Sequence, residues 1–168
     1  MAWTKMKTAV VAGACVLIAT GTTLVTMKHI RHYKADLIAR KVTGQPPQKE
    51  SDLKNQLPGT WELVATRSGG PNGLRYYPTN NGHYKIFTPT DWKIVTYDSQ
   101  SNVVYSAGGP YALHGNVYME TVESATGAMT QFLGAHPRFK IRIEGNTYYQ
   151  LGVGGNAWVQ EIWQRVQE

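Results

Sequence analysis

The chain has very little cysteine, and its C-terminal two thirds carry no net charge. Cys15 is the one cysteine among 168 residues, which excludes an internal disulfide framework and a cysteine-rich metal site. Residues 1–58 hold nine lysines and arginines against three acids, whereas residues 59–168 hold eight of each sign. A nucleic-acid-binding domain concentrates cationic charge on its folded part. The charge distribution therefore argues against nucleic acid as a partner.

Charge is also missing from residues 8–27. At about 1.5 Å rise per residue, this apolar run would span roughly 30 Å of hydrocarbon. We predict that residues 1–27 are an N-terminal, single-pass membrane anchor. A cleaved secretory signal, with a weak cleavage site at residues 19–21, and a merely buried helix are the alternatives.

The sequence after the anchor is first basic and then rich in proline and glycine. Residues 28–42 continue as a basic helix, lying on anionic headgroups or simply extending the anchor into solvent. Residues 43–51 have the composition of a linker, and Ser51 is expected to cap a short helix over residues 52–57. The predicted domains are the anchor or signal segment (1–27), the basic helix and linker (28–50) and a folded domain (51–168).

The folded domain shows strand patterning throughout. Runs rich in valine, isoleucine, threonine, tyrosine and tryptophan alternate with glycine, asparagine and proline. Tight-turn sequences join several runs, so neighbouring strands must be antiparallel. Eight such strands can close into an up-and-down barrel, which removes the exposed edges of an open sheet. The expected strands are Thr60–Arg67, His83–Thr88, Trp92–Asp98, Val103–Leu113, Val117–Ser124, Arg138–Glu144, Thr147–Val153 and Trp158–Val166.

No catalytic set is visible in the sequence. The sequence contains no Gly-x-Ser-x-Gly motif. It also contains no phosphate-binding glycine loop, because no helix is expected after the glycines at positions 152, 154 and 155. Glu120 and Glu123 are three residues apart on an expected strand, so they point to opposite faces and cannot act as an acid/base pair. The histidines are scattered, and His29-x-x-His32 has no carboxylate nearby. We therefore expect no enzymatic activity, no metal site and no cofactor.

A tryptophan at the start of the first strand needs a cover. In an up-and-down barrel, Trp61 would plug one end and bury on the order of 200 Å². The last strand would bring Arg165 beside it, so that the guanidinium stacks on the indole and bonds the terminal carbonyls of the short helix.

Gly59-Thr60-Trp61, the preceding helix and Arg165 together resemble the lipocalin-like (calycin) superfamily. The phrases "KIFTPTDWKIVTYD" (85–98), "YALHGNVYMETVES" (111–124) and "EIWQRV" (161–166) look more specifically like bacterial lipocalin-like domains of uncharacterised role. The resemblance covers about residues 55–168. It implies a lipocalin-like barrel with Gly59, Trp61 and Arg165 as its structural signature, and it carries over no catalytic residues.

Small barrels either fill their interior or leave room for one small ligand. Aromatic residues that pack apolar surface and offer a polar handle suit a ligand site, and Glu161 shares one strand face with Trp163 and Arg165. The segment 124–137 forms either a lid over the barrel mouth or a plain packing loop. The candidate ligand-binding residues of the lumen and mouth are Trp92, Tyr118, Met129, Phe132, Glu161 and Trp163.

The expected function is binding of a small apolar or amphiphilic molecule by a membrane-tethered, lipocalin-like barrel. A non-catalytic interaction or structural module of the cell envelope, with a packed barrel and a protein partner, is the alternative. Lys28, Arg31 and Lys34 behind the anchor favour a cytoplasmic domain by the positive-inside rule. Domains of the type that the resemblance implies are more familiar outside the cytoplasm, where we expect the barrel; cleavage of the signal would make it secreted or periplasmic.

Overall fold

The structure is a computed structural model that describes residues 38–67, 75–156 and 159–167. The predicted anchor, the alternative cleavage site and most of the basic helix lie outside these residues. Among the described residues, no helix is both long enough and apolar enough to cross a membrane.

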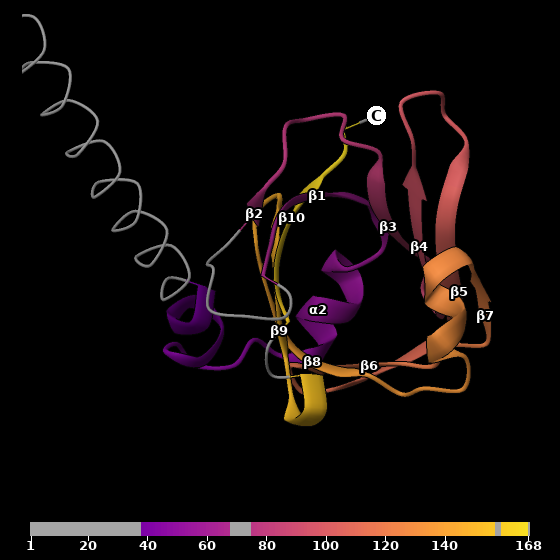
Figure 1. Ribbon diagram of the computed structural model, residues 1–168. Helices are drawn as coiled ribbons and strands as arrows, with labels where there is room; N and C mark the ends of the chain where they lie inside the picture. The colour runs from indigo at the N-terminus through magenta and orange to yellow at the C-terminus, as the bar shows by residue number, and fades with distance from the viewer. Residues whose placement is uncertain (1–37, 68–74, 157–158, 168) are drawn as a thin grey trace, which may run out of the picture.

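Eight antiparallel strands close into a barrel (Figure 1). Their order around the barrel is β1-β3-β4-β5-β6-β8-β9-β10, and β10 pairs with β1 to complete the ring. The strands of the ring are β1 (Gly59–Arg67), β3 (His83–Phe87), β4 (Asp91–Tyr97), β5 (Val103–His114), β6 (Val117–Glu120), β8 (Arg138–Glu144), β9 (Thr147–Gly152) and β10 (Gln160–Arg165). Two short strands lie beside the ring: β2 (Arg75–Tyr76) pairs with β1, and β7 (Ser124–Thr126) pairs with β5. The expected all-β, eight-stranded up-and-down barrel is therefore confirmed.

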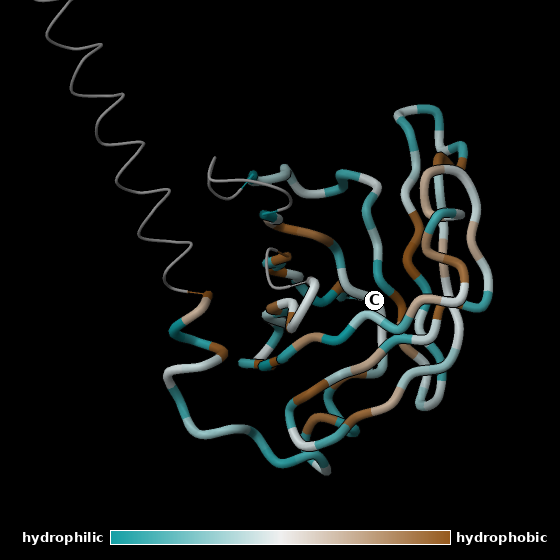
Figure 2. Tube along the Cα trace, turned by 60° about the horizontal axis from the view of Figure 1, so that its bottom comes forward, coloured by the Kyte–Doolittle hydropathy of each residue, from teal (hydrophilic) through white to brown (hydrophobic). Residues whose placement is uncertain are grey.

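The strands alternate between the core and the outer surface. In β8, Phe139, Ile141 and Ile143 are buried, while the residues between them are not. Figure 2 shows the same short alternation of hydrophobic and hydrophilic residues along the chain. This period of two fixes which side chains enter the lumen.

One expected strand is wrong in its extent. The run 117–124 is not continuous, because β6 ends at Glu120 and β7 begins at Ser124. The partner strand β5 contains Gly108-Gly109-Pro110, where the proline has no N–H to donate to a neighbour. At this point the Thr121 carbonyl oxygen occupies the space that a Cβ on residue 109 would need. The second half of the run, Ser124–Thr126, pairs instead with residues 106–108 of β5.

Helix α2 (Glu50–Gln56) closes one end of the barrel. It begins two residues earlier than expected, with Lys49 at the N-cap and no side-chain cap, so the predicted Ser51 cap is wrong. Glu50 and Asp52 instead place negative charge in the first turn, where it favours the helix dipole. Leu53 and Leu57 are fully buried in the main core.

Trp61 fills the barrel beside this helix and is fully buried. Its indole Nε1 donates to the Leu57 carbonyl at 2.9 Å, and the Arg165 guanidinium lies over the ring at 4.1 Å from its centroid. Arg165 also donates to the carbonyls of Pro58, at 2.8 Å, and Gln56. The expected contact of Trp61, Arg165 and the carbonyls behind the helix is thus present.

Gly59 makes this contact sterically possible. Its φ is +129°, which side-chain-bearing residues rarely adopt, and a Cβ there would stand 2.5 Å from Arg165 Nη1. The glycine of the signature is therefore required by backbone conformation and by the close approach of the guanidinium.

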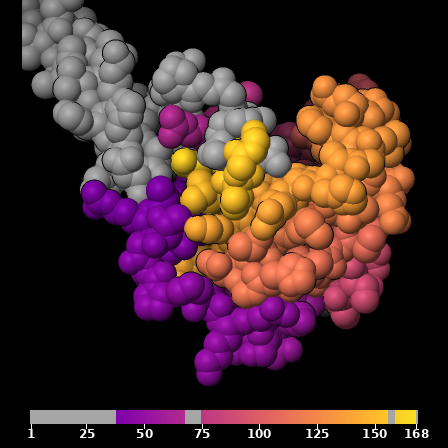
Figure 3. Space-filling model, turned by 90° about the horizontal axis from the view of Figure 1, so that it is seen from below, coloured from indigo at the N-terminus to yellow at the C-terminus, as the bar shows by residue number. Residues whose placement is uncertain are grey.

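Residues 38–49 lie against the outer wall of the barrel. Residues 38–43 are helical, and Ile38 and Val42 are buried there in a second core cluster with Ala65. In this described part of the expected basic helix, the apolar side chains therefore pack on the barrel and face neither headgroups nor solvent. Figure 3 shows the first of the described residues in indigo along one side of the molecule.

The expected linker is also bound to the barrel. The Gln48 side-chain amide donates to the Ile143 carbonyl and accepts from the Ile143 N–H, both at 2.8 Å. Strand β6 pairs with β8 only as far as Lys140, so the glutamine amide replaces part of a missing strand. Lys41 adds an ion pair to Glu144 at 2.6 Å.

Candidate functional site: a cavity with a polar end

A cavity of about 420 Å³ enters the barrel at the end opposite α2. Glu50 of α2 contacts Gly115 beyond one end of β5, whereas the 3-10 helix η1 (Gly127–Phe132) packs near the other end of that strand. Met129 and Phe132 of η1 border the cavity, and Phe132 is 43% exposed, so the cavity reaches the surface there. The side chains that line it are Lys85, Trp92, Ile94, Tyr105, Glu120, Val122, Met129, Phe132, Ala135, His136, Pro137, Phe139, Gln150, Val159 and Glu161.

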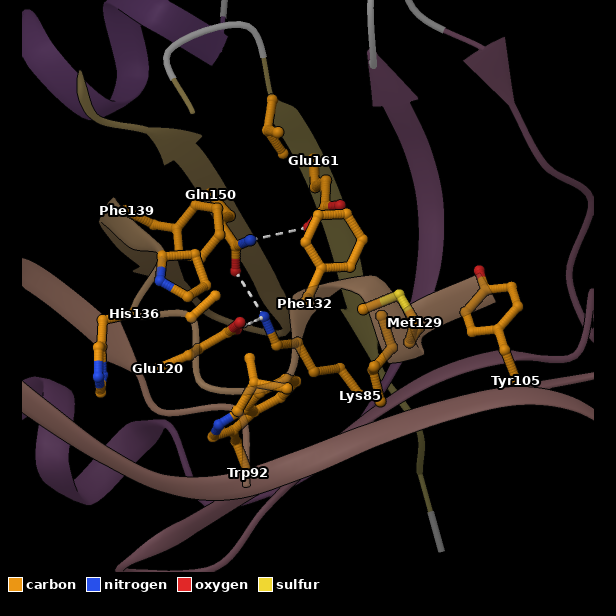
Figure 4. A pocket seen from close by; sticks show the side chains of 15 residues that line it. Lys85, Trp92, Tyr105, Glu120, Met129, Phe132, His136, Phe139, Gln150 and Glu161 are labelled. Atoms are coloured by element: carbon orange, nitrogen blue, oxygen red, sulfur yellow. Dashed lines mark hydrogen bonds and ion pairs between the residues drawn. The ribbon is translucent and has the colours of Figure 1, made fainter. Parts of the chain in front are cut away.

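The inner end of the cavity is polar (Figure 4). Lys85 Nζ donates to Glu120 Oε1 at 2.5 Å and to Gln150 Oε1 at 2.9 Å. Gln150 Nε2 in turn donates to Glu161 Oε2 at 2.9 Å. Four strands, β3, β6, β9 and β10, supply one side chain each, so the barrel must be closed before the network can form.

Two aromatic hydroxyls and one indole support this network from behind. Tyr118 donates to Glu120 Oε1 at 2.9 Å, Tyr148 donates to Gln150 Oε1, and Trp163 Nε1 donates to Glu161 Oε2 at 3.1 Å. Burial raises the pKa of both tyrosine hydroxyls well above their ordinary value. They therefore stay neutral and act as donors.

The Lys85 ammonium is enclosed by aromatic rings. It lies 5.1 to 5.8 Å from five ring centroids, and the residue is 2% exposed. Cation–π attraction and the ion pair with Glu120 together offset the loss of hydration. The five rings belong to Phe87, Trp92, Tyr118, Phe139 and Trp163.

Glu161 is the second carboxyl at this end of the cavity. Burial raises the pKa of Glu161, and the charge of Glu120 raises it further, while Lys85 and the Trp163 hydrogen bond lower it. The network thus holds two carboxyl groups and one ammonium, which leaves an excess negative charge when both carboxyls are ionised.

The structure brings most of the expected ligand-binding residues to this cavity. Trp92, Met129, Phe132 and Glu161 line it. Tyr118 and Trp163 are fully buried behind the wall rather than on it, and each donates to a carboxylate that does line the cavity. The ligand-binding role of all six stays a prediction.

Sequence reasoning missed Lys85, Glu120 and Gln150. Strand alternation carried a signal for each of them, because Lys85 is two residues from Phe87, Glu120 two from Tyr118, and Gln150 two from Tyr148. All three neighbours are buried in the core. Glu161, which the sequence did place among the candidate residues, accepts hydrogen bonds from the Gln150 amide and the Trp163 indole.

Metal binding has no support in the described part of the chain. No group of three or more His, Cys, Asp or Glu side chains there could hold a metal ion. His136 lines the cavity but is exposed and contacts the Thr121 hydroxyl at 3.3 Å.

Fold and site together define a class: a small, eight-stranded, up-and-down barrel with a cavity in its lumen, the architecture that lipocalins also use. The chain belongs to the family described as "Domain of unknown function (DUF4488)", which matches residues 56–168. The family match covers the barrel and leaves out residues 38–49, which pack on its outer wall.

Comparison with solved structures finds several similar chains, among them two from Bacteroides. A lipocalin-like protein from Bacteroides uniformis ATCC 8492 is 12% identical, with a TM-score of 0.49, 66% of this chain covered and 98% of that chain. An uncharacterized protein from Bacteroides eggerthii DSM 20697 is 10% identical, with a TM-score of 0.49, 65% of this chain covered and 98% of that chain. At these TM-scores neither likeness bears on ligand or role. Comparison with curated proteins finds no match.

Proposed function

We propose that this barrel binds a small amphiphilic molecule in its lumen. The observation that carries the proposal is the cavity of about 420 Å³, which has apolar walls and a polar inner end. Pockets of about 300–1,000 Å³ with mostly apolar walls and a few fixed polar groups are typical of small-molecule sites. The apolar part of the ligand would contact Trp92, Phe132 and Phe139, and its polar part would reach the Glu120 and Glu161 carboxyls.

The cavity favours this function over a solid interaction module. A packed barrel would fill the space between η1 and the Lys85 network with side chains, since protein interiors are close-packed. An unfilled apolar volume forfeits dispersion contacts that a ligand would restore. The alternative, an envelope interaction module with a protein partner, therefore has less support.

Binding also fits the polar groups better than catalysis does. Lys85 is held in an ion pair with Glu120, whereas a nucleophilic lysine must be free of its proton. Glu120 and Glu161 are both tied to donors on neighbouring strands. We therefore propose a non-catalytic binding protein.

The N-terminal apolar run would tether this barrel to a membrane, with the barrel outside the cytoplasm. The support is the sequence of residues 8–27 and the close packing of residues 38–49 on the barrel, which would leave about ten residues between anchor and barrel wall. Deleting residues 1–27 should move the protein from the membrane fraction to the soluble fraction. Continued sedimentation with membranes would contradict the tether.

A neutral fluorescent probe tests the binding function directly. N-phenyl-1-naphthylamine should bind residues 38–168, a fragment that contains both described core clusters, and gain fluorescence as it leaves water. Ala135→Phe adds a ring to the cavity wall and should weaken probe binding by about ten-fold or more, because the ring occupies ligand volume. Native mass spectrometry of the same fragment should show a co-purifying small molecule.

The matched control is Ala128→Phe. Ala128 is exposed on η1 and does not line the cavity, so the same substitution there should leave probe affinity unchanged. Equal probe binding by wild type and both variants would place the probe outside the cavity. Absence of any probe binding, with no co-purifying mass, would overturn the proposed function.

A further inference from the structure

The acceptor-rich end of the cavity points to the charge of the ligand. We propose that the occupant is a cationic amphiphile, an organic molecule with an apolar body and an ammonium group that binds between Glu161 and Glu120. This inference rests on the proposed function and adds the chemical class of the ligand's polar end.

The first argument is the count of hydrogen-bond donors and acceptors. Glu120 Oε1 accepts from Lys85 and Tyr118, and Glu161 Oε2 accepts from Gln150 and Trp163. The other oxygen of each carboxyl accepts no hydrogen bond from any described residue, although both side chains line the cavity. A carboxylate oxygen that faces a cavity takes its donors from water or from a ligand, and an ammonium group supplies three donors.

The second argument is charge balance. The network contains Lys85 as its one cation and two carboxyls, and burial of Glu161 disfavours its ionised form. A ligand ammonium would supply the missing positive charge and make charge-assisted hydrogen bonds of the kind that are roughly twice as strong as neutral ones. A ligand carboxylate or phosphate would instead bring a third negative group into the same low-dielectric space.

Lys85 is not a ready site for an anion. Its ammonium already donates to Glu120 and Gln150, so an anion bound to it would have to lie beside the Glu120 carboxylate. Like charges at such a distance repel strongly when they are shielded from water. The aromatic wall favours a cation further, because Trp92, Phe132 and Phe139 present rings to the cavity.

Three probes of the same shape separate charge from apolar contact. We would titrate 4-phenylbutylammonium, 4-phenylbutanol and 4-phenylbutyrate into the full chain in zwitterionic lipid nanodiscs, with protein-free nanodiscs as the blank, and follow binding by calorimetry at neutral pH. The ammonium should bind about ten-fold more tightly than the alcohol, because a charge-assisted hydrogen bond replaces a neutral one. The carboxylate should bind more weakly than the alcohol.

The variant that tests the assignment is Glu161→Gln. It keeps the acceptor for Gln150 and Trp163 and leaves the pair of Lys85 with Glu120 in place, so the fold should be retained. We expect the ammonium to lose its advantage of about ten-fold over the alcohol, which is measured as the ratio of the two affinities in the same variant. Glu123→Gln is the control, because this substitution removes the same formal charge from an exposed residue that does not line the cavity.

The outcomes separate this inference from the proposed function. Equal affinity for the three probes, or preference for the carboxylate, would overturn the cationic ligand while leaving a binding barrel. A preference for the ammonium that survives Glu161→Gln, or that Glu123→Gln removes as well, would also overturn it. Absence of binding by all three probes would count against the binding function itself.

Discussion

Replacing Lys85 with methionine should destabilise the barrel more than any comparable change of a surface lysine. The residue is 2% exposed, and its ammonium pairs with a carboxylate that is itself 5% exposed. Methionine has a similar length and no charge, so Lys85→Met removes the cation without opening a large cavity. Breaking a buried ion pair by removing one partner costs about 3–5 kcal/mol, because the remaining charge is left buried and unpaired.

Urea unfolding of residues 38–168 at neutral pH measures this cost. The double variant Lys85→Met/Glu120→Gln should recover a large part of the loss, because the unpaired carboxylate is gone. Lys93→Met is the matched control, since Lys93 is exposed on the neighbouring strand β4 and should change the free energy of unfolding by no more than about 0.5 kcal/mol. If Lys85→Met costs no more than Lys93→Met, the buried network does not stabilise the barrel and the reasoning is refuted.

Three further predictions concern Glu161 and the end of the barrel that α2 closes. Arg165→Lys keeps the charge but loses the stacked, two-pronged contact over Trp61, and should lower the free energy of unfolding by about 1–2 kcal/mol. Gly59→Ala should cost about 1–3 kcal/mol, because alanine is strained at a φ of +129° and its Cβ displaces Arg165. Urea unfolding measures the stability of both variants. An unchanged free energy of unfolding in either variant would contradict the contact described for Trp61, Arg165 and Gly59. Because burial raises the pKa of Glu161, its ionisation destabilises the folded state above that pKa, and Glu161→Gln should be more stable than wild type at neutral pH. This advantage should shrink as the pH falls through the raised pKa toward the ordinary value of a glutamate, and an advantage that grows at low pH would contradict the assignment.

The barrel could be predicted because its signals are local or occur at the chain ends. The alternation of "RFKIRIE" alone defines β8 with its observed bounds, Arg138–Glu144. Trp61 and Arg165 lie at opposite ends of the domain, but closure of an up-and-down barrel brings the first and last strands together, so topology predicts their contact.

The polar network could not be predicted with the same ease. A lysine in a strand is usually solvated, and Lys85 is buried only because carboxylate and amide partners arrive from residues 35 and 65 positions further along the chain. No pattern in the sequence around Lys85 predicts partners so far along the chain. The aromatic residues of the cavity wall could be predicted from the sequence. The charged end could not, because it depends on the register of four separate strands.

The packing of residues 38–49 on the barrel was equally hidden. Gln48 pairs with the backbone of Ile143 because β6 begins only at Val117, after the turn from β5, and leaves this part of β8 without a strand partner. A proline-rich, polar sequence predicts a linker by composition, and only the tertiary structure supplies the strand edge that it covers.

The two methionines of residues 38–168 allow the most direct test of a ligand cavity. Met129 lines the cavity, whereas Met119 lies on β6 and does not. In protein labelled with ¹³C at the methionine methyl groups, saturating 4-phenylbutylammonium should shift the Met129 resonance and give nuclear Overhauser contacts from its methyl group to the phenyl protons, with Met119 unchanged. An unmoved Met129 resonance at saturation, or contacts to Met119 alone, would contradict the account.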